Sequence, residues 1–160
     1  MKNLPRWIFS SVVWHFKTIA DDNNIPYFVE GIDERDPNSM NQSHVEIRVT
    51  GPEIKEISNE YYNVEVVINF LLTSLMDMTG SRAYEIINWC GILSDEMNSP
   101  IPIYKYGDGA EDDDSLINCL RIRKNKSDSV KIYHFGQVSK TDRVRQSEID
   151  AVYDMDVTNL

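Results

Sequence analysis

Residues 61–73 read YYNVEVVINFLLT, and the alternation of their side chains decides the fold class that the sequence predicts. One face of this segment is apolar and consists of Tyr62, Val64, Val66, Ile68, Phe70 and Leu72. The other face is dominated by Tyr61, Asn63, Glu65, Asn69 and Thr73. Alternation with a period of two is typical of a half-buried β-strand. The segment is more than twice the mean strand length of about 5–6 residues, so we expect it to extend beyond the core of one subunit and to pair between subunits.

Hydrophobic patterns elsewhere in the chain predict two helices and further strands. A helical stripe begins after Asn3, with Pro5 in its first turn, and should end at NNIP, residues 23–26. A second helical pattern covers residues 80–98. The proline-rich residues 99–107 are expected to be extended and poorly suited to a central strand. The other predicted strands are residues 44–50, which end at Gly51-Pro52, a hairpin of 115–123 and 129–136, and residues 147–157.

The order of these elements predicts an α+β fold. Strands in runs, with the helices set apart, are typical of a mostly antiparallel sheet with two main helices packed on one face. Residues 1–160 are the length of a single domain. Polar, turn-rich sequence predicts exposed loops near 30–43, 107–114 and 137–147.

Composition narrows the classes of function. Sixteen Lys and Arg against 26 Asp and Glu give a formal net charge of −10, which disfavours a conventional nucleic-acid-binding or anionic-membrane-binding module. No segment approaches the roughly 20 apolar residues of a membrane span. Cys90 and Cys119 lie far apart, and the N-terminal sequence lacks the features of a secretory leader, so we expect two reduced thiols and assembly in a cytoplasm.

The most acidic stretch is YGDGAEDDDS, residues 106–115. It fails the calcium-loop template, because Gly109 stands second and Cys119 twelfth in DGAEDDDSLINC. A weak divalent-cation site, a pair of catalytic carboxylates and a solvated loop tip remain open, and glycine-rich sequence favours the loop. Acidic residues recur on the polar face of the last strand, so one face of the protein is expected to be negative. The candidate acids of this face, expected to dock a partner or to face the lumen if the chain forms a ring, are Asp108, Glu111, Asp112, Asp113, Asp114, Glu148, Asp150, Asp154 and Asp156.

Catalytic and metal-binding motifs are absent from the sequence. It contains no GxSxG, GxxxxGK[ST], GxGxxG or HExxH, and its three histidines, His15, His44 and His134, belong to three different predicted elements. We therefore predict no enzymatic activity, no cofactor and no metal site. Trp7 and Trp14 flank the apolar stripe of the first helix, where they either pack into the core or anchor a subunit interface. The candidate interface residues are Trp7, Trp14, Tyr61, Asn63 and Glu65.

Several strings of the sequence resemble small structural proteins of tailed bacteriophages. They are LPRWIF, VEGIDER, LLTSLMD, PIPIYKYGDG followed by DDDSL, and HFGQVSKTDRVRQSEIDA, which together span most of the chain. The element order resembles that of the tail terminator, or tail completion, proteins. The resemblance implies an α+β subunit of a hexameric ring in the virion neck, which joins the tail tube protein to the head–tail connector while phage DNA passes through the lumen.

Physical arguments agree with this resemblance, and they leave other functions open. A ring needs head-to-tail contacts between neighbours, and an acidic lumen would let DNA slide because it repels phosphates. The alternatives are another neck or tail component, such as a head-completion or tail-tube protein, and an acidic anti-host protein that mimics DNA. A further alternative is an enzyme that uses a metal held by the carboxylates of residues 108–114.

Overall fold

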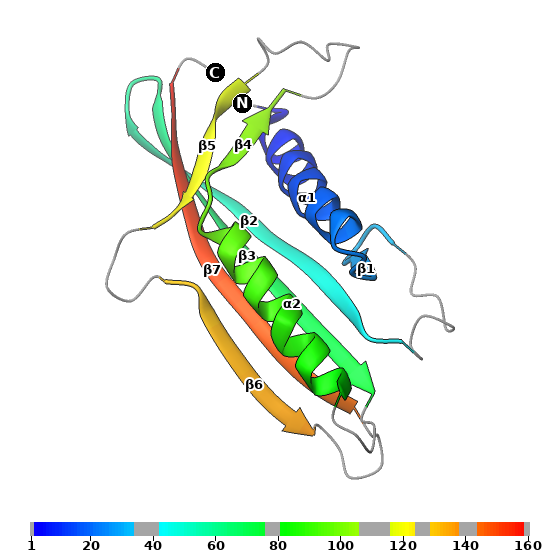
Figure 1. Cartoon of the computed structure of the whole chain (residues 1–160). Helices are drawn as coiled ribbons and strands as arrows, with labels where there is room; N and C mark the ends of the chain where they lie inside the picture. Colours follow the sequence, from blue (N-terminus) through cyan, green and yellow to red (C-terminus); the bar gives the residue numbers. More distant parts are fainter. Residues whose placement is uncertain are drawn as a thin grey trace.

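The computed structural model describes residues 2–33, 42–75, 81–105, 116–123, 129–137 and 144–158. Two helices and a seven-stranded, mostly antiparallel sheet confirm the predicted α+β fold (Figure 1). The elements are α1 (Leu4–Asp22), β1 (Tyr27–Val29), β2 (His44–Ser58), β3 (Tyr61–Leu75), α2 (Ser81–Met97), β4 (Ile101–Tyr104), β5 (Leu116–Ile122), β6 (Lys131–Gln137) and β7 (Val144–Thr158).

The sheet is built around β3 and β7, which pair antiparallel from Tyr61↔Thr158 to Leu75↔Val144. The strand order is β1-β2-β3-β7-β5-β4, and β6 also pairs with β7. Among the described strands only β1 and β2 pair in parallel. Residues 61–73, from which the fold class was predicted, therefore lie in the middle of the sheet.

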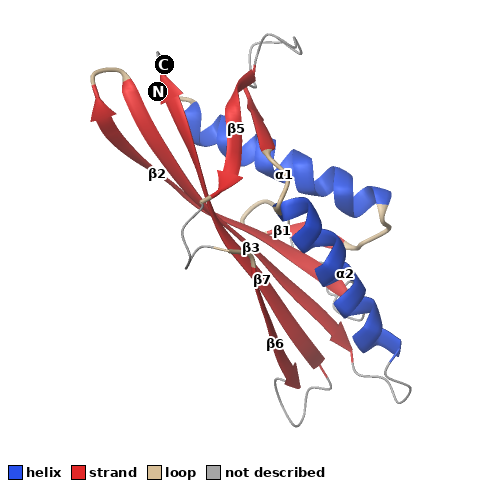
Figure 2. Ribbon diagram, turned by 60° about the vertical axis from the view of Figure 1, so that its left-hand side comes forward, coloured by secondary structure: helices blue, strands red, loops and turns tan. Residues whose placement is uncertain are grey.

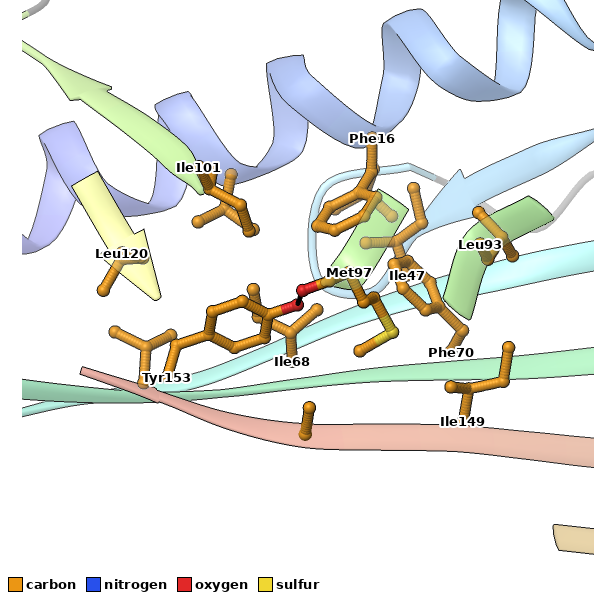
Figure 3. Close-up of a cluster of buried hydrophobic side chains, with 14 of the residues drawn as sticks. Phe16, Ile47, Ile68, Phe70, Leu93, Met97, Ile101, Leu120, Ile149 and Tyr153 are labelled. Carbon is orange, nitrogen blue, oxygen red and sulfur yellow. Dashed lines mark hydrogen bonds between the residues drawn. The ribbon is translucent and has the colours of Figure 1, made fainter. Parts of the chain in front are cut away.

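Both helices pack on the same face of the sheet (Figure 2). α1 contacts β2 and β4, whereas α2 contacts β3 and β7. The core between these layers is apolar and closely packed (Figure 3). The ring of Phe16 meets that of Phe70 edge to face, with centroids 4.7 Å apart. Alternate residues of β3 and β7 supply the sheet side of the core, as their period-two pattern predicts.

The prediction that the strand at 44–50 ends at Gly51-Pro52 is wrong. β2 continues to Ser58, with a register shift between Thr50 and Glu53. Gly51 makes this irregularity possible, because its φ is +107° and a Cβ atom there would lie 3.1 Å from the carbonyl oxygen of Glu65. The strand thus bends at glycine and goes on to form a long hairpin with β3.

The prediction of a hairpin between residues 115–123 and 129–136 is also wrong. β5 pairs with β4 and, at Arg121 and Ile122, with β7. β6 pairs with a different part of β7, from Asp150 to Arg145. The fifteen-residue β7 is long enough to hold both strands one after the other along the same edge, so it replaces the expected local partner.

One strand at the edge of the sheet was predicted from the sequence, and another was not. β4 contains Pro102 and lies at the end of the strand order, which confirms that the proline-rich segment is not a central strand. β1 was not predicted from the sequence.

The three predicted loops lie largely outside the described residues. Residues 30–33 form a turn after β1, and residues 34–41 are not described. The acidic loop at 107–114 lies wholly outside the described residues. Near 137–147 the prediction is partly wrong, because residues 144–147 already belong to β7; their pairing with β3 extends the strand beyond its alternating apolar pattern.

Candidate functional site

The face of the sheet opposite the helices carries most of the described candidate residues. No described helix or strand packs over this face (Figure 2). Side chains alternate along β3 and β7, so their outward-facing residues form cross-strand pairs. The polar pairs are Asn63 with Asp156, Glu65 with Asp154 and Asn69 with Asp150, and Leu71 lies opposite Glu148. We call this surface the uncovered face.

The structure brings together two groups of candidates that the sequence analysis treated separately. The predicted acids of β7 lie on the uncovered face, and so do the predicted interface residues of β3. These residues are Glu148, Asp150, Asp154 and Asp156 from β7, and Tyr61, Asn63 and Glu65 from β3. The acids at 108 and 111–114 lie outside the described residues.

At one end of the uncovered face, Asp156 is the centre of a hydrogen-bond cluster. Its carboxylate accepts hydrogen bonds from Tyr61 Oη at 2.6 Å and from Asn63 Nδ2 at 3.0 Å. Its backbone carbonyl accepts one from Asn118 Nδ2 at 2.6 Å. The bonds from Asn63 and Tyr61 lower the pKa of Asp156, because they stabilise the charged form. The hydrogen bond between Tyr61 and Asp156 also raises the pKa of Tyr61. This acid is therefore held in place by its neighbours.

Farther along the uncovered face, the side chain of an arginine that follows β5 reaches across β7 to β3. Arg123 Nη1 forms an ion pair with Glu65, and its backbone N–H donates to the carbonyl of Val152 at 3.0 Å. Arg121 lies opposite Asp154 in the register of β5 and β7. Neither arginine was a candidate from the sequence, because the pairing of β5 with β7 has no signal in the linear pattern.

Near β1, a carboxylate is buried on the uncovered face. The side chain of Glu46 is 3% exposed, and one of its oxygens lies 3.2 Å from Arg48 Nε. The same nitrogen lies 3.5 Å from a carboxylate oxygen of Glu30. Asn69 donates a hydrogen bond to Glu148 in the adjacent part of the face. Each of these carboxylates has a donor nearby, as buried charges require.

The charge of the uncovered face is consequently mixed. Its acids lie beside basic and amide groups. Arg48, Arg121 and Arg123 accompany the carboxylates, and Lys131 lies opposite Asp150 in the register of β6 and β7. Pairing across strands, which the linear sequence does not display, produces this result.

The two tryptophans of α1 differ in their surroundings. Trp7 is half-buried against the core, and Lys105 Nζ lies 5.9 Å from the centroid of its ring. Trp14 is 62% exposed. Of the two interpretations offered by the sequence, packing fits Trp7, and Trp14 has the exposure that an interface residue needs.

The three histidines lie in three separate environments. His44 Nδ1 is 3.0 Å from the carbonyl oxygen of Gln42. Burial lowers the pKa of His15, although Glu96 acts in the opposite direction. His134 Nδ1 lies 2.8 Å from Ser147 Oγ. Within the described residues, no group of three or more His, Cys, Asp or Glu side chains is placed to hold a metal ion.

The uncovered face continues onto β6, because Tyr133 lies opposite Glu148 in the register of β6 and β7. Among the described strands, β6 pairs with β7 alone. Tyr133 and Phe135 are 45% and 55% exposed, and their rings stack at 6.3 Å with an interplanar angle of 12°. These aromatics were not candidates from the sequence, because the exposure of their strand depends on its pairing with β7.

Comparisons with known proteins show the fold alone. No family model matches the chain, and no curated protein matches it. One solved structure is similar over 98% of this chain and 96% of its own, with a TM-score of 0.57 and 14% sequence identity. None of the helices in the described part of the chain is long and apolar enough to cross a membrane.

Proposed function

We propose that this chain is a structural subunit of a tailed-bacteriophage virion, a tail terminator or a related neck protein that acts by assembly into a ring. Its partners are other copies of itself, the tail tube protein and the head–tail connector, with DNA passing through the lumen. The resemblance of sequence strings to small phage structural proteins supports this function. The structural observation that carries the proposal is the exposed aromatic pair on β6, which is an edge strand among the described strands.

An edge strand with exposed aromatic residues is well suited to a subunit contact. Free strand edges offer unpaired N–H and C=O groups to another chain, and proteins normally protect them. Tyrosine and phenylalanine are enriched in the buried centres of interfaces. Tyr133 and Phe135 combine the two features on one strand. We therefore place one side of the subunit contact at β6.

A closed ring also needs a second, different surface, because neighbours meet head to tail. The β2–β3 hairpin provides one on the far side of the sheet from β6 (Figure 1). β1 pairs with β2 only at residues 45–47, and the remainder of β2 carries Ile57, which is exposed. β3 itself is paired on both edges within the chain, with β2 from Tyr61 to Thr73 and with β7 from Tyr61 to Leu75, so the expectation that it pairs between subunits is wrong. The strand of this hairpin that lies toward the edge of the sheet is β2.

The polar part of the uncovered face, on β3 and β7, is a candidate for the lumen or for docking to a neighbouring ring. The carboxylates of Asp156 and Glu65 are held there by hydrogen bonds and an ion pair. Such a surface would present little free positive charge to DNA, which needs to slide without being bound. The acidic DNA-mimic alternative has less support, because a mimic needs rows of free carboxylates.

Mass photometry of the purified protein tests the assembly. We expect a species near six times the chain mass of 18.5 kDa. Phe135→Asp should reduce the ring to smaller species, because it buries a charge in the proposed contact. Ile32→Asp, at an exposed apolar residue of the turn after β1, is the matched control and should leave the ring intact. Circular dichroism confirms that both variants fold.

A protein that stays monomeric at all concentrations and is absent from purified virions would contradict the proposal. Cryo-EM of the virion then decides among the members of the class. Density at the top of the tail tube supports a terminator, whereas density inside the connector or along the tube supports a head-completion or tail-tube protein. Capture of a host nucleic-acid enzyme by the monomer would favour the DNA mimic.

A further inference from the structure

A small cavity lies between the N-terminal half of α2 and the sheet. Its volume is about 120 Å³, and its lining comes from α2, β3, β6 and β7. Its lining includes Ser74, Ala83, Ile87, His134, Arg145 and Ser147. The cavity lies on the helix side of the sheet, away from the uncovered face, and it does not depend on the assembly proposed above.

The buried, unpaired hydroxyl of Ser74 suggests a ligand-binding role for the cavity. Its side chain is 0% exposed, and its hydroxyl has no hydrogen-bond partner among the described residues. A buried hydroxyl without a partner destabilises a protein, and native structures rarely keep one without a reason. Because Ser74 lines the cavity, a ligand there would provide the missing partner.

A second polar group in the lining comes from β6 and β7. His134 Nδ1 and Ser147 Oγ are 2.8 Å apart, so each holds the other in place. Ser147 is also hydrogen-bonded to Cys90, whose thiol pKa is raised to about 11 by burial. That thiol is therefore protonated at neutral pH, and it acts as a support for Ser147 rather than as a nucleophile.

Arg145 gives the cavity its charge. The residue is half-buried at the start of β7, and no acidic group among the described residues forms an ion pair with it. Ala83 lies in the first turn of α2, so the positive end of the helix dipole is on the same side. Among the described residues that line the cavity there is no carboxylate to offset these charges.

We propose that this cavity binds a small monocarboxylate. Its two oxygens accept hydrogen bonds from Arg145 and from the hydroxyl of Ser74, with the His134–Ser147 pair beside them. Ala83 and Ile87 form an apolar wall against which a short alkyl group packs. The volume suits a ligand of roughly four to six non-hydrogen atoms. A tetrahedral oxyanion fits less well, because it would turn an oxygen toward that apolar wall.

An NMR titration with sodium propionate tests the site, with sodium chloride at equal ionic strength as the reference. We expect saturable shifts of the backbone amides of Ser74 and Ser147, with a dissociation constant on the order of millimolar. Arg145→Gln should weaken binding about tenfold or more, because a charged donor is lost. Arg6→Gln, at an exposed arginine of α1, is the matched control and should not change binding.

Two further variants separate a binding role from a structural one. Ser74→Ala should weaken propionate binding several-fold while leaving the ligand-free melting temperature unchanged or higher, because it removes an unpaired buried hydroxyl. Ala83→Leu should fill the cavity and abolish binding in a folded protein. If Ser74→Ala lowers the melting temperature and leaves binding unchanged, the hydroxyl has another role and the proposal fails.

Titration with a second ligand distinguishes a free carboxylic acid from a carboxylate that belongs to a protein chain. A short peptide with blocked termini and a single glutamate tests a carboxylate carried by a protein chain, whereas propionate tests a free acid. Binding of either at the same amides supports the site, and the tighter ligand identifies the source. Absence of saturable shifts with both ligands overturns the proposal, as does equal binding of sodium sulfate, which would show attraction of charge alone.

Discussion

The two faces of β3 and β7 are made by alternate residues of the same strands, yet they are stabilised in different ways. On the helix side, Ile68 and Phe70 are fully buried in an apolar core. On the uncovered face, the adjacent Asn69 hydrogen-bonds to Glu148, and Glu65 pairs with Arg123. Apolar burial is non-directional and large, whereas each polar contact is specific and contributes little net free energy. The first face therefore determines the stability of the fold, and the second determines the chemistry of its surface.

The largest expected difference between the faces is at Phe70 and Leu71, which are neighbours in sequence. Phe70→Ala should lower the free energy of unfolding by about 3–5 kcal/mol, because it leaves a cavity beside Phe16. Leu71→Ala, on the uncovered face, should lower it by only about 1 kcal/mol. Urea denaturation measures both values. Equal losses would show that something covers the second face.

A smaller effect is expected where a polar group enters the core. Tyr153 Oη donates a hydrogen bond of 2.7 Å to the carbonyl oxygen of Met97, the last residue of α2 (Figure 3). Burial raises the pKa of Tyr153, so the hydroxyl remains a donor. Tyr153→Phe should lower the free energy of unfolding by about 1–3 kcal/mol, because it leaves a helix-terminal carbonyl buried and unpaired.

Tyr84→Phe is the control for that experiment. Tyr84 is 75% exposed, so water replaces any bond that its hydroxyl loses. Thermal unfolding followed by circular dichroism compares the two variants. If Tyr153→Phe is as harmless as Tyr84→Phe, the hydrogen bond does not stabilise the end of α2.

The helix-facing side of the sheet is the part of the fold that the sequence predicts best. Alternation in residues 61–73 identified β3, and the helical stripe after Asn3 identified α1, because burial imposes a period on the side chains. Pairing between strands has no such period. The sequence pattern therefore does not indicate that β5 and β6 both pair with β7. It also does not indicate that β2 continues beyond the irregularity at Gly51.

The uncovered face was predictable in composition and unpredictable in pairing. Alternation placed Asp154 and Asp156 on the polar side of the last strand, where the structure has them. Their partners depend on the register between strands far apart in sequence, so the contact of Asp156 with Asn63 was not foreseen. The role of Arg123 was missed for the same reason. The acids at 108 and 111–114 lie outside the described residues, so the expectation of a negative face stays a prediction.

The ion pair of Glu65 and Arg123 tests how little a contact of the uncovered face contributes to stability. Both side chains are partly exposed to solvent. A double-mutant cycle of Glu65→Gln and Arg123→Gln should give a coupling energy of at most about 1 kcal/mol. Added salt should reduce it, because ions screen exposed charges. A larger coupling that salt does not change would mean that the pair is buried, as in an assembled ring.

The smallest expected effect is a change in a single pKa on the same face. Hydrogen bonds from Asn63 and Tyr61 lower the pKa of Asp156 in the folded protein. Because this pKa is lower in the folded than in the unfolded protein, the carboxylate stabilises the fold fully at pH values above the unfolded pKa of about 4. This stabilisation is lost as the pH falls through the folded pKa.

In an NMR pH titration, Asn63→Ala should move the pKa of Asp156 upward, toward its ordinary value. Gln146→Ala, at a polar residue near the other end of β7, should leave it unchanged. An Asp156 pKa that is ordinary in the wild type would instead indicate that the β2–β3 hairpin separates from β7 in solution, and the uncovered face would then be the less rigid of the two.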